Sequence, residues 1–266
     1  MKKSVSLNDH EREIFSKIQA IAFDWSGTLC DDLRFAHAGA VILARKLGID
    51  IECDPIAWGH HPSTNPVEDL NTRLRIAQEK GEAVPETLLS MTGEKYSNLY
   101  GEILDKLRAG HIPDNELPNS AVNIAPKPIT TSVSALKDLW ECYCRPDDAP
   151  FYLVSACPIN VLMEGVHEYG LDDIFLWDMH GSCNVKATKL TEIAAMRGIP
   201  TSALAYVGDT AGDVRATKRA GAISIGVTTG YHAKETVVEA GPDLVYDTAG
   251  DFCMRYRAFV KDRDNR

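Results

Sequence analysis

The stretch Ala203–Val227, ALAYVGDTAGDVRATKRAGAISIGV, places two mainly apolar runs on either side of a polar segment. The runs ALAYV and ISIGV are typical of strands that are buried on both faces, as in a parallel sheet covered by helices. Between them, Asp213–Ala220 has a helical pattern, and Gly221 stands where a helix C-terminal cap belongs. The stretch therefore predicts a strand–helix–strand unit with parallel strands.

The same alternation of short apolar runs and helical segments continues on both sides of this unit. It predicts an α/β fold with a doubly wound parallel sheet. Further strands are predicted at Ile18–Phe23, Phe151–Val154, Ile174–Trp177 and Leu244–Tyr246, and further helices at Val161–Tyr169 and Thr188–Arg197, which Gly170 and Gly198 follow.

The segment from Cys30 to about Pro150 breaks this alternation, because it has helical patterns and almost no strand pattern. Connecting segments rich in Pro and Asn separate these helices, which indicates a helical domain inserted after the first strand. We therefore expect a core at residues 1–30 and 146–266 and a helical cap at residues 31–145. The predicted cap helices are Arg34–Leu47, Val67–Lys80, Pro85–Arg108 and Val133–Tyr143.

Composition excludes several classes of partner. The 266 residues carry a formal net charge of −10, and no cluster of Lys and Arg offers a surface for nucleic acid. No apolar run is long enough for a membrane span or a signal peptide, and the seven cysteines lack a paired metal-binding pattern. We expect free thiols and a cytoplasmic protein with no membrane partner; a homodimer is compatible with the sequence, which does not fix the oligomeric state.

Three polar groups follow three predicted strands directly: Asp24, Ser155 and the pair Gly208-Asp209. Ligands of open α/β sheets bind at the carboxyl ends of the strands, so these distant residues are expected to converge there. Asp24 begins the turn Asp24–Leu29 (DWSGTL) and can attack a phosphoryl group, hold a cation, or merely cap a helix. The Ser155 hydroxyl, with the N–H groups of the following helix, can hold an anion or act as an ordinary N-cap.

Asp209 and Asp213 place two carboxylates four residues apart at the third strand end. Such a pair suits an oxygen-ligated Mg²⁺, although Asp213 could also cap the helix that follows. Lys186 precedes another predicted helix, where it can neutralise phosphate charge, pair with Asp24, or remain a solvated surface lysine.

In this order, Asp-x-x-Gly-Thr-Leu, a Ser after a strand, a Lys and Gly-Asp-x-x-x-Asp resemble the haloacid dehalogenase (HAD) superfamily. The stretch Tyr206–Val227 is similar to its phosphoglycolate-phosphatase-like members, and the resemblance covers about residues 17–30 and 150–250. It implies a Mg²⁺-dependent hydrolase that removes phosphate from a small phosphorylated metabolite through an aspartyl-phosphate. By position it implies Asp24 as nucleophile and Ser155 and Lys186 as phosphoryl ligands, with Lys189 as a weaker candidate for the lysine. Asp24, Asp209, Asp213 and the backbone carbonyl of Ser26 would hold the metal. Gly27, Thr28 and Ala156 would lie beside the substrate, and Trp25 would form an apolar wall of the pocket or belong to the core.

One position departs from the family. Phosphatases of this superfamily usually carry a second Asp two residues after the nucleophile as a general acid and base, and here that position is Ser26. A serine hydroxyl is a poor proton donor, so the acid must come from elsewhere or be unnecessary. His60-His61 is one candidate source.

Two alternatives stay open. Phosphonoacetaldehyde hydrolases resemble the chain in Asp-Trp-x-Gly-Thr and need a cap lysine, for which Lys46, Lys80, Lys95 and Lys106 are available. A non-catalytic phosphometabolite-binding protein is the other alternative. The dehalogenases of the superfamily work without Mg²⁺, and the pair Asp209 and Asp213 disfavours that choice.

Overall fold

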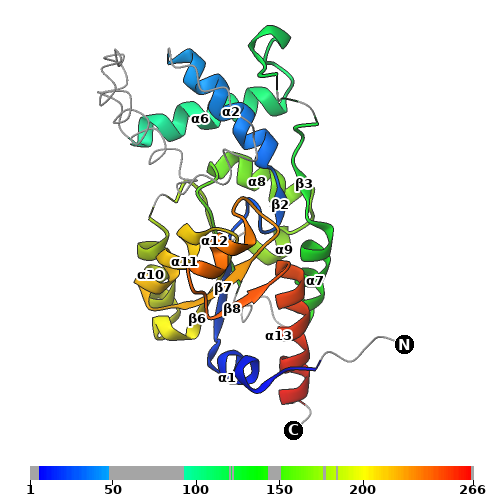
Figure 1. Cartoon of the computed structure of the whole chain (residues 1–266), viewed down its shortest axis with the longest axis vertical. Coiled ribbons are helices and arrows are strands. Elements are labelled where there is room, and N and C mark those ends of the chain that lie inside the picture. The colour runs from blue at the N-terminus through cyan, green and yellow to red at the C-terminus, as the bar shows by residue number, and fades with distance from the viewer. Residues whose placement is uncertain are drawn as a thin grey trace.

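The computed structural model of the chain describes residues 6–47, 93–119, 121, 123–142, 151–175, 178–183 and 185–264. Within these ranges, six parallel strands form one sheet in the order β5-β4-β1-β6-β7-β8. Helices cover both faces of the sheet, and α2 and α6 lie together beyond one end of it (Figure 1). The predicted doubly wound α/β fold is confirmed.

The strands of the sheet are short, and the four central ones are wholly buried. They are β1 (Ala20–Phe23), β4 (Phe151–Val154), β5 (Met179–His180), β6 (Leu204–Gly208), β7 (Ile223–Val227) and β8 (Leu244–Tyr246). The helices around them are α1 (Asp9–Lys17), α7 (Thr130–Trp140), α8 (Ile159–Glu168), α9 (Asp172–Phe175), α10 (Lys186–Arg197), α11 (Ala211–Ala220), α12 (Lys234–Glu239) and α13 (Ala249–Asp264).

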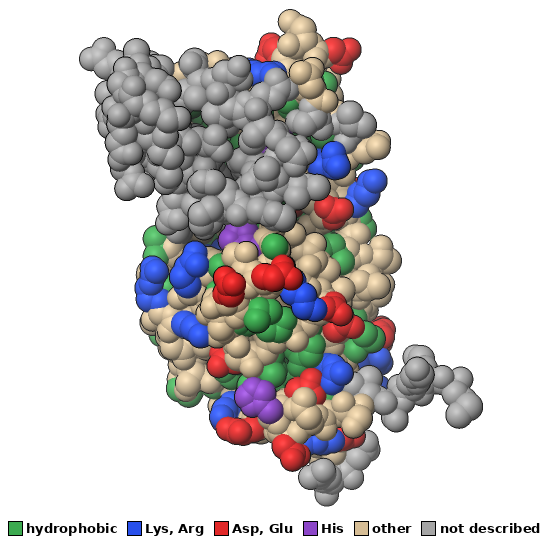
Figure 2. Space-filling model, in the orientation of Figure 1, with side chains coloured by type: hydrophobic (Ala, Val, Ile, Leu, Met, Phe, Trp, Pro, Cys, Tyr) green, Lys and Arg blue, Asp and Glu red, His purple; other side chains and the backbone are tan. Residues whose placement is uncertain are grey.

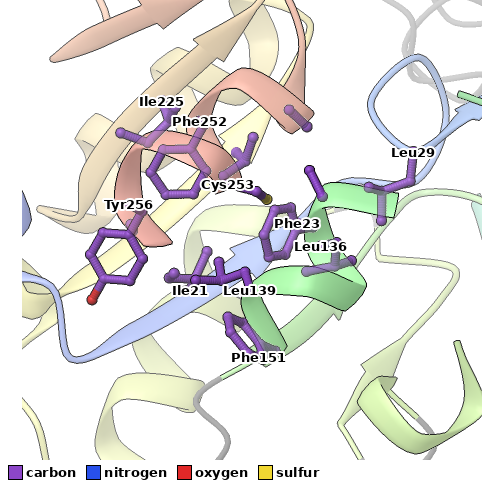
Figure 3. Packing of buried hydrophobic residues seen from close by; sticks show 14 of the residues in the cluster. Ile21, Phe23, Leu29, Leu136, Leu139, Phe151, Ile225, Phe252, Cys253 and Tyr256 are labelled. Carbon is purple, nitrogen blue, oxygen red and sulfur yellow. The ribbon is translucent and has the colours of Figure 1, made fainter. Parts of the chain in front are cut away.

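The sequence of strand β1 is apolar throughout, and the packing on its two faces explains why. Ile21 and Phe23 point to one face, where they pack with Phe252 of α13 and Leu136 of α7 (Figure 3). The alternate residues of β1 point to the other face, where Leu190 and neighbouring residues of α10 cover them. A strand with helices on both faces has no exposed position, so a continuous apolar run is the expected sequence.

The predicted glycine caps are also present. Gly198 and Gly221 are the C-cap residues of α10 and α11, and Gly170 follows the C-cap of α8. All three have a positive φ, between 62° and 75°, which a glycine adopts without the cost that a side chain adds.

One predicted strand is wrong. Residues 172–175 form helix α9 and not part of a strand at Ile174–Trp177, and the edge strand β5 begins only at Met179. A short apolar run has the same composition in a buried strand and in a buried helical turn, so periodicity does not separate them. Asp172 and Asp173 stand in the first turn of α9, where acidic side chains favour a helix N-terminus.

The cap contains helices α2 (Leu33–Lys46) and α6 (Gly93–Arg108), which pack on each other through Phe35, Leu43 and Leu104. The short antiparallel strands β2 (Cys30–Asp31) and β3 (Lys127–Pro128) run between this pair and the core (Figure 1). The predicted helix at Val67–Lys80 and the first part of Pro85–Arg108 lie outside the described residues.

Helix α7 packs with a different part of the chain from the one that the predicted domain division assigns it to. It lies within residues 31–145, which the sequence analysis assigned to the cap, but it packs along the core helix α13. Leu136 and Leu139 of α7 belong to the main core cluster beside the sheet (Figure 3). The packing therefore places α7 with the elements of the core, and the division into core and cap stays a prediction.

Charged side chains of both signs are visible on the core in Figure 2. On the face drawn in Figure 2, Lys and Arg side chains are interspersed with Asp and Glu side chains over the core. None of the helices that the structure describes has the length and apolar character needed to cross a membrane. Cys30, Cys142, Cys157, Cys183 and Cys253 are free thiols.

Candidate active site

The three strand ends that carry polar groups are neighbours in the sheet. Strand β1 lies between β4 and β6, so Asp24, Ser155 and Asp209 meet at one edge. They line one cavity together with Ser26, Ala156 and Lys186, which the sequence analysis also singled out. The rest of its lining was not predicted: Asp32, Phe35, Ala36, Tyr100, Leu104, Cys157, Pro158, Val161, Thr210 and Tyr231.

Lys186, the first residue of α10, extends into the carboxylates at this edge. Its Nζ donates to Oδ2 of Asp24 at 2.7 Å and to Oδ1 of Asp213 at 2.6 Å. Burial alone would lower the pKa of Lys186, but Asp213 and Asp24 beside it raise that pKa well above its usual value. Lys186 is therefore a fixed positive charge next to the predicted nucleophile. Lys189 instead pairs with Glu192 one turn along the same helix.

Asp24, Asp209 and Asp213 form a buried carboxylate cluster in which one oxygen of each lies within 4.8 Å of the others. Burial raises the pKa of Asp24 although Lys186 acts against it, and burial next to Asp213 and Asp24 raises the pKa of Asp209 well above its usual value. Three carboxyl groups thus face one lysine. The donor set is all oxygen, and its three carboxyl groups outnumber the one lysine, so it fits a hard divalent cation such as Mg²⁺.

The turn after Asp24 is shaped by its closeness to Asp209. Gly27 has a φ of +72°, and a Cβ at this position would collide with the Asp209 carboxylate and lie 2.8 Å from Cα of Gly230. Thr28 is buried below the turn and donates its hydroxyl to Oδ1 of Asp209 at 3.1 Å. The backbone N–H of Tyr231 donates to the other oxygen of Asp209 at 2.7 Å. Gly27 therefore leaves room for the Asp209 carboxylate and Thr28 helps to hold it, and neither residue lines the cavity.

Asp213 has two roles in the structure. It forms a capping box with Thr210 at the start of α11, in which each residue's side chain accepts from the other's backbone N–H. Its second oxygen faces Lys186. The helix cap expected at Asp213 is therefore present, together with an ion pair to Lys186 that was not expected from the sequence.

A hydrogen-bonded group that the sequence analysis missed lies close to Asp24 in the cavity lining. The hydroxyl of Ser26 donates to Oδ2 of Asp32 at 2.7 Å, and the hydroxyl of Tyr231 donates to Oδ1 of Asp32 at 3.0 Å. Asp32 is 6% exposed, and burial raises its pKa to about 7 despite these two donors. The signal in the sequence was a carboxylate at the start of the cap, but only the fold of the turn brings it to Ser26.

The side of the cavity opposite the carboxylates is apolar. Phe35 of α2, Tyr100 and Leu104 of α6 and Val161 of α8 line it, so the cap and the core enclose it together. Among the described residues, Lys186 is the one lysine or arginine in the lining. The cavity thus combines a charged floor with an apolar roof, a common arrangement in sites for small molecules.

Several predicted substrate contacts lie elsewhere. Trp25 is 1% exposed and stacks on Tyr169, so its side chain belongs to the core and not to the cavity wall. Lys46, Lys95 and Lys106 lie outside the cavity lining. Lys80 and His60-His61 fall outside the described residues.

Residues 186–252 match the family model described as HAD-hydrolase-like. A stretch of 59 residues is 36% identical to the phosphoglycolate phosphatase of Salmonella typhi, and one of 66 residues is 35% identical to that of Synechococcus elongatus. These matches cover 22% and 25% of this chain, and only 23% and 31% of the length of those two proteins.

Solved structures resemble the chain over most of its length. A predicted phosphoglycolate phosphatase of Haemophilus somnus has a TM-score of 0.63 at 15% identity, covering 90% of this chain and 97% of its own. A haloacid dehalogenase-like hydrolase of Streptococcus pneumoniae has a TM-score of 0.60 at 14% identity, covering 91% and 99%. At this identity the likeness shows the fold alone. With the ordered motifs and the family match over residues 186–252, it makes the chain similar to proteins of the haloacid dehalogenase superfamily.

Proposed function

We propose that this chain is a Mg²⁺-dependent phosphatase that hydrolyses phosphate monoesters of small metabolites through an aspartyl-phosphate on Asp24. The observation that carries the proposal is the contact between Asp24 and Lys186 within the carboxylate cluster that Asp209 and Asp213 complete. The phosphoglycolate phosphatases that the chain partly matches support the reaction class.

Each residue of the site has a definite task in this proposal. Asp24 attacks phosphorus, which a carboxylate oxygen at a strand end can approach from one fixed direction. Lys186 and the hydroxyl of Ser155 hold the phosphoryl oxygens, and the N–H groups before α8 contribute as well. Asp24, Asp209 and Asp213 would hold Mg²⁺. When bound, the ion supplies positive charge that offsets the repulsion between the phosphate and the carboxylates.

The carbon–phosphorus hydrolase alternative depends on a cap lysine that reaches the substrate. Among the described residues, none of the cap lysines lines the cavity. A non-catalytic binding protein has no need of a carboxylate held beside Lys186. Phosphoester hydrolysis is therefore the function that the geometry supports best.

A panel of phosphorylated metabolites, phosphonates and 4-nitrophenyl phosphate, assayed with Mg²⁺ and with chelator, tests this proposal. Turnover of phosphate esters is expected with Mg²⁺ only, and Asp24→Asn should abolish it while the variant stays folded. Asp31→Asn is the matched control, because Asp31 is exposed and lies outside the cavity lining. Substantial turnover by Asp24→Asn, or release of phosphate from phosphonates alone, would overturn the proposal.

A further inference from the structure

The apolar roof of the cavity consists of four side chains from three helices: Phe35, Tyr100, Leu104 and Val161. Each is at most 6% exposed, and all four belong to one hydrophobic cluster. These side chains carry a single polar atom, the Tyr100 hydroxyl, which donates to the backbone oxygen of Ala36 at 2.9 Å. The roof therefore presents carbon to whatever enters the cavity.

Two roof residues are held in place by close packing of α6 on α2. Gly39 stands in the interior of α2, where a glycine is less stable than an alanine. A Cβ at Gly39 would collide with Cδ2 of Leu104 and lie 3.2 Å from Cε2 of Tyr100. The glycine thus gives Leu104 and Tyr100 their places beside α2, and the shape of the roof is set by this contact.

Positive charge in the described lining is confined to the opposite side of the cavity. Lys186 already contacts Asp24 and Asp213 there. Arg108 lies over the Phe35 ring at 5.9 Å from its centroid, but it is outside the described lining and pairs with Glu164 at 3.0 Å.

The arrangement has a consequence for an ester whose phosphoryl group lies at Asp24 and Lys186. Its organic part then meets the apolar roof. An apolar group gains free energy there, because its surface leaves water. A carboxylate would lose its water against carbon, which is costly without a partner of opposite charge.

We propose that the apolar roof binds the organic part of the substrate and selects phosphate monoesters of small, uncharged, apolar alcohols over esters that carry a carboxylate. The proposal rests on the phosphatase activity proposed above. It assigns Leu104 and Val161 as specificity-determining residues. The family match at residues 186–252 includes none of the roof residues, so a likeness in that segment carries no information about the organic part of the substrate.

Isobutyl phosphate and phosphoglycolate form a matched pair of probes. They have the same number of non-hydrogen atoms, and two methyl groups of the first replace the two carboxylate oxygens of the second. We expect kcat/KM with Mg²⁺ to be about 10-fold or more higher for isobutyl phosphate. Both values are measured on one preparation, so their ratio does not depend on the fraction of folded protein.

Variants of the roof test whether it produces this ratio. Leu104→Ala should lower kcat/KM for isobutyl phosphate by about 10-fold and change that for phosphoglycolate far less. Val161→Thr keeps the shape of the side chain and adds a hydroxyl, so it should lower the ratio in the same direction. Leu107→Ala is the matched control, because Leu107 lies on the same helix and in the same cluster but outside the described lining. It should keep the ratio of the unaltered protein.

Thermal unfolding first establishes that each variant is folded at the assay temperature. A ratio near one in the unaltered protein, or one that favours phosphoglycolate, would overturn the proposed selectivity and leave the phosphatase proposal standing. The same holds if the ratio falls equally in Leu104→Ala and Leu107→Ala, or stays unchanged in both Leu104→Ala and Val161→Thr. Turnover of 4-nitrophenyl phosphate without turnover of isobutyl phosphate would also overturn the selectivity alone. Absence of turnover of every ester would overturn the phosphatase activity, and the selectivity with it.

Discussion

Lys186 and Asp24 form a nearly buried ion pair, with Nζ 2.7 Å from Oδ2 and side-chain exposures of 15% and 7%. The same Nζ contacts Asp213, so one lysine serves two carboxylates that come from different strand ends. Removing it would leave these carboxyl groups together without a cation, which is costly in a dry site.

We expect Lys186→Met to lower the free energy of unfolding, measured without metal, by about 3–5 kcal/mol. The matched control is Lys189→Met on the same helix, since Lys189 pairs with the half-exposed Glu192. Such a surface pair contributes about 1 kcal/mol or less. Urea unfolding of both variants at pH 7 in chelator measures the difference; similar small losses would show that the carboxylates are relieved by protonation or rearrangement instead.

Metal binding should be visible in stability as well as in activity. Mg²⁺ is expected to raise the Tm, because a ligand at 100 times its Kd adds about 2.7 kcal/mol to the folded state. Asp209→Asn should lose most of this Mg²⁺-dependent rise, whereas Asp247→Asn should keep it, because the Asp247 side chain is 78% exposed and away from the cluster. A Tm rise of equal size in both variants would place the ion elsewhere.

The sequence was informative where composition alone decides the structure. The strand at Phe151–Val154 has the predicted bounds, because a parallel strand that is buried on both faces is apolar throughout. The order of strands then brings Asp24 and Asp209 together, since residues at the carboxyl ends of neighbouring parallel strands meet.

The sequence was less informative where the position of a residue depends on which distant segment it contacts. The spacing of Leu136 and Leu139 predicts a helix with an apolar face, but it does not say whether that face meets the cap or α13. Asp32 is the clearest case. Its link to Ser26 depends on a turn that doubles back between β1 and β2, and Tyr231 reaches it from a loop almost 200 residues further along the chain.

The pKa of Asp32 gives a pH-dependent stability. It is about 7 in the folded protein against an ordinary value of 3.8, so the folded state holds a proton that the unfolded state has lost between these values. The stability from this group is present in full below about pH 4 and is lost as the pH rises toward 7, after which the loss is constant. At about 1.4 kcal/mol per pH unit, the loss is at most about 4 kcal/mol.

Asp32→Asn cannot ionise, so it should gain stability relative to the unaltered protein between pH 5 and pH 8. Chemical unfolding of both proteins across that range measures the gain, with Asp247→Asn as the exposed control that should follow the unaltered protein. Parallel stability curves for Asp32→Asn and the unaltered protein would mean that Asp32 is already ionised in the fold at pH 5.

Gly27 offers a test of how closely the nucleophile turn approaches the metal site. An alanine at position 27 would be strained by the φ of +72° and would also collide with the Asp209 carboxylate. Gly110 separates these two effects, because its φ is +68° but nothing lies within 4 Å of a Cβ placed there. Conformational strain alone costs about 1–2 kcal/mol.

We therefore expect Gly110→Ala to lower the free energy of unfolding by about 1–2 kcal/mol and to leave turnover unchanged. Gly27→Ala should cost more than that, because Asp209 or the turn must move to accommodate the methyl group. Moving Asp209 by even 1 Å weakens a site that depends on fixed geometry, so a loss of about 10²-fold in kcat is expected for Gly27→Ala. Equal destabilisation by the two variants, with turnover retained in both, would show that the turn can retreat from Asp209 without disturbing the carboxylates.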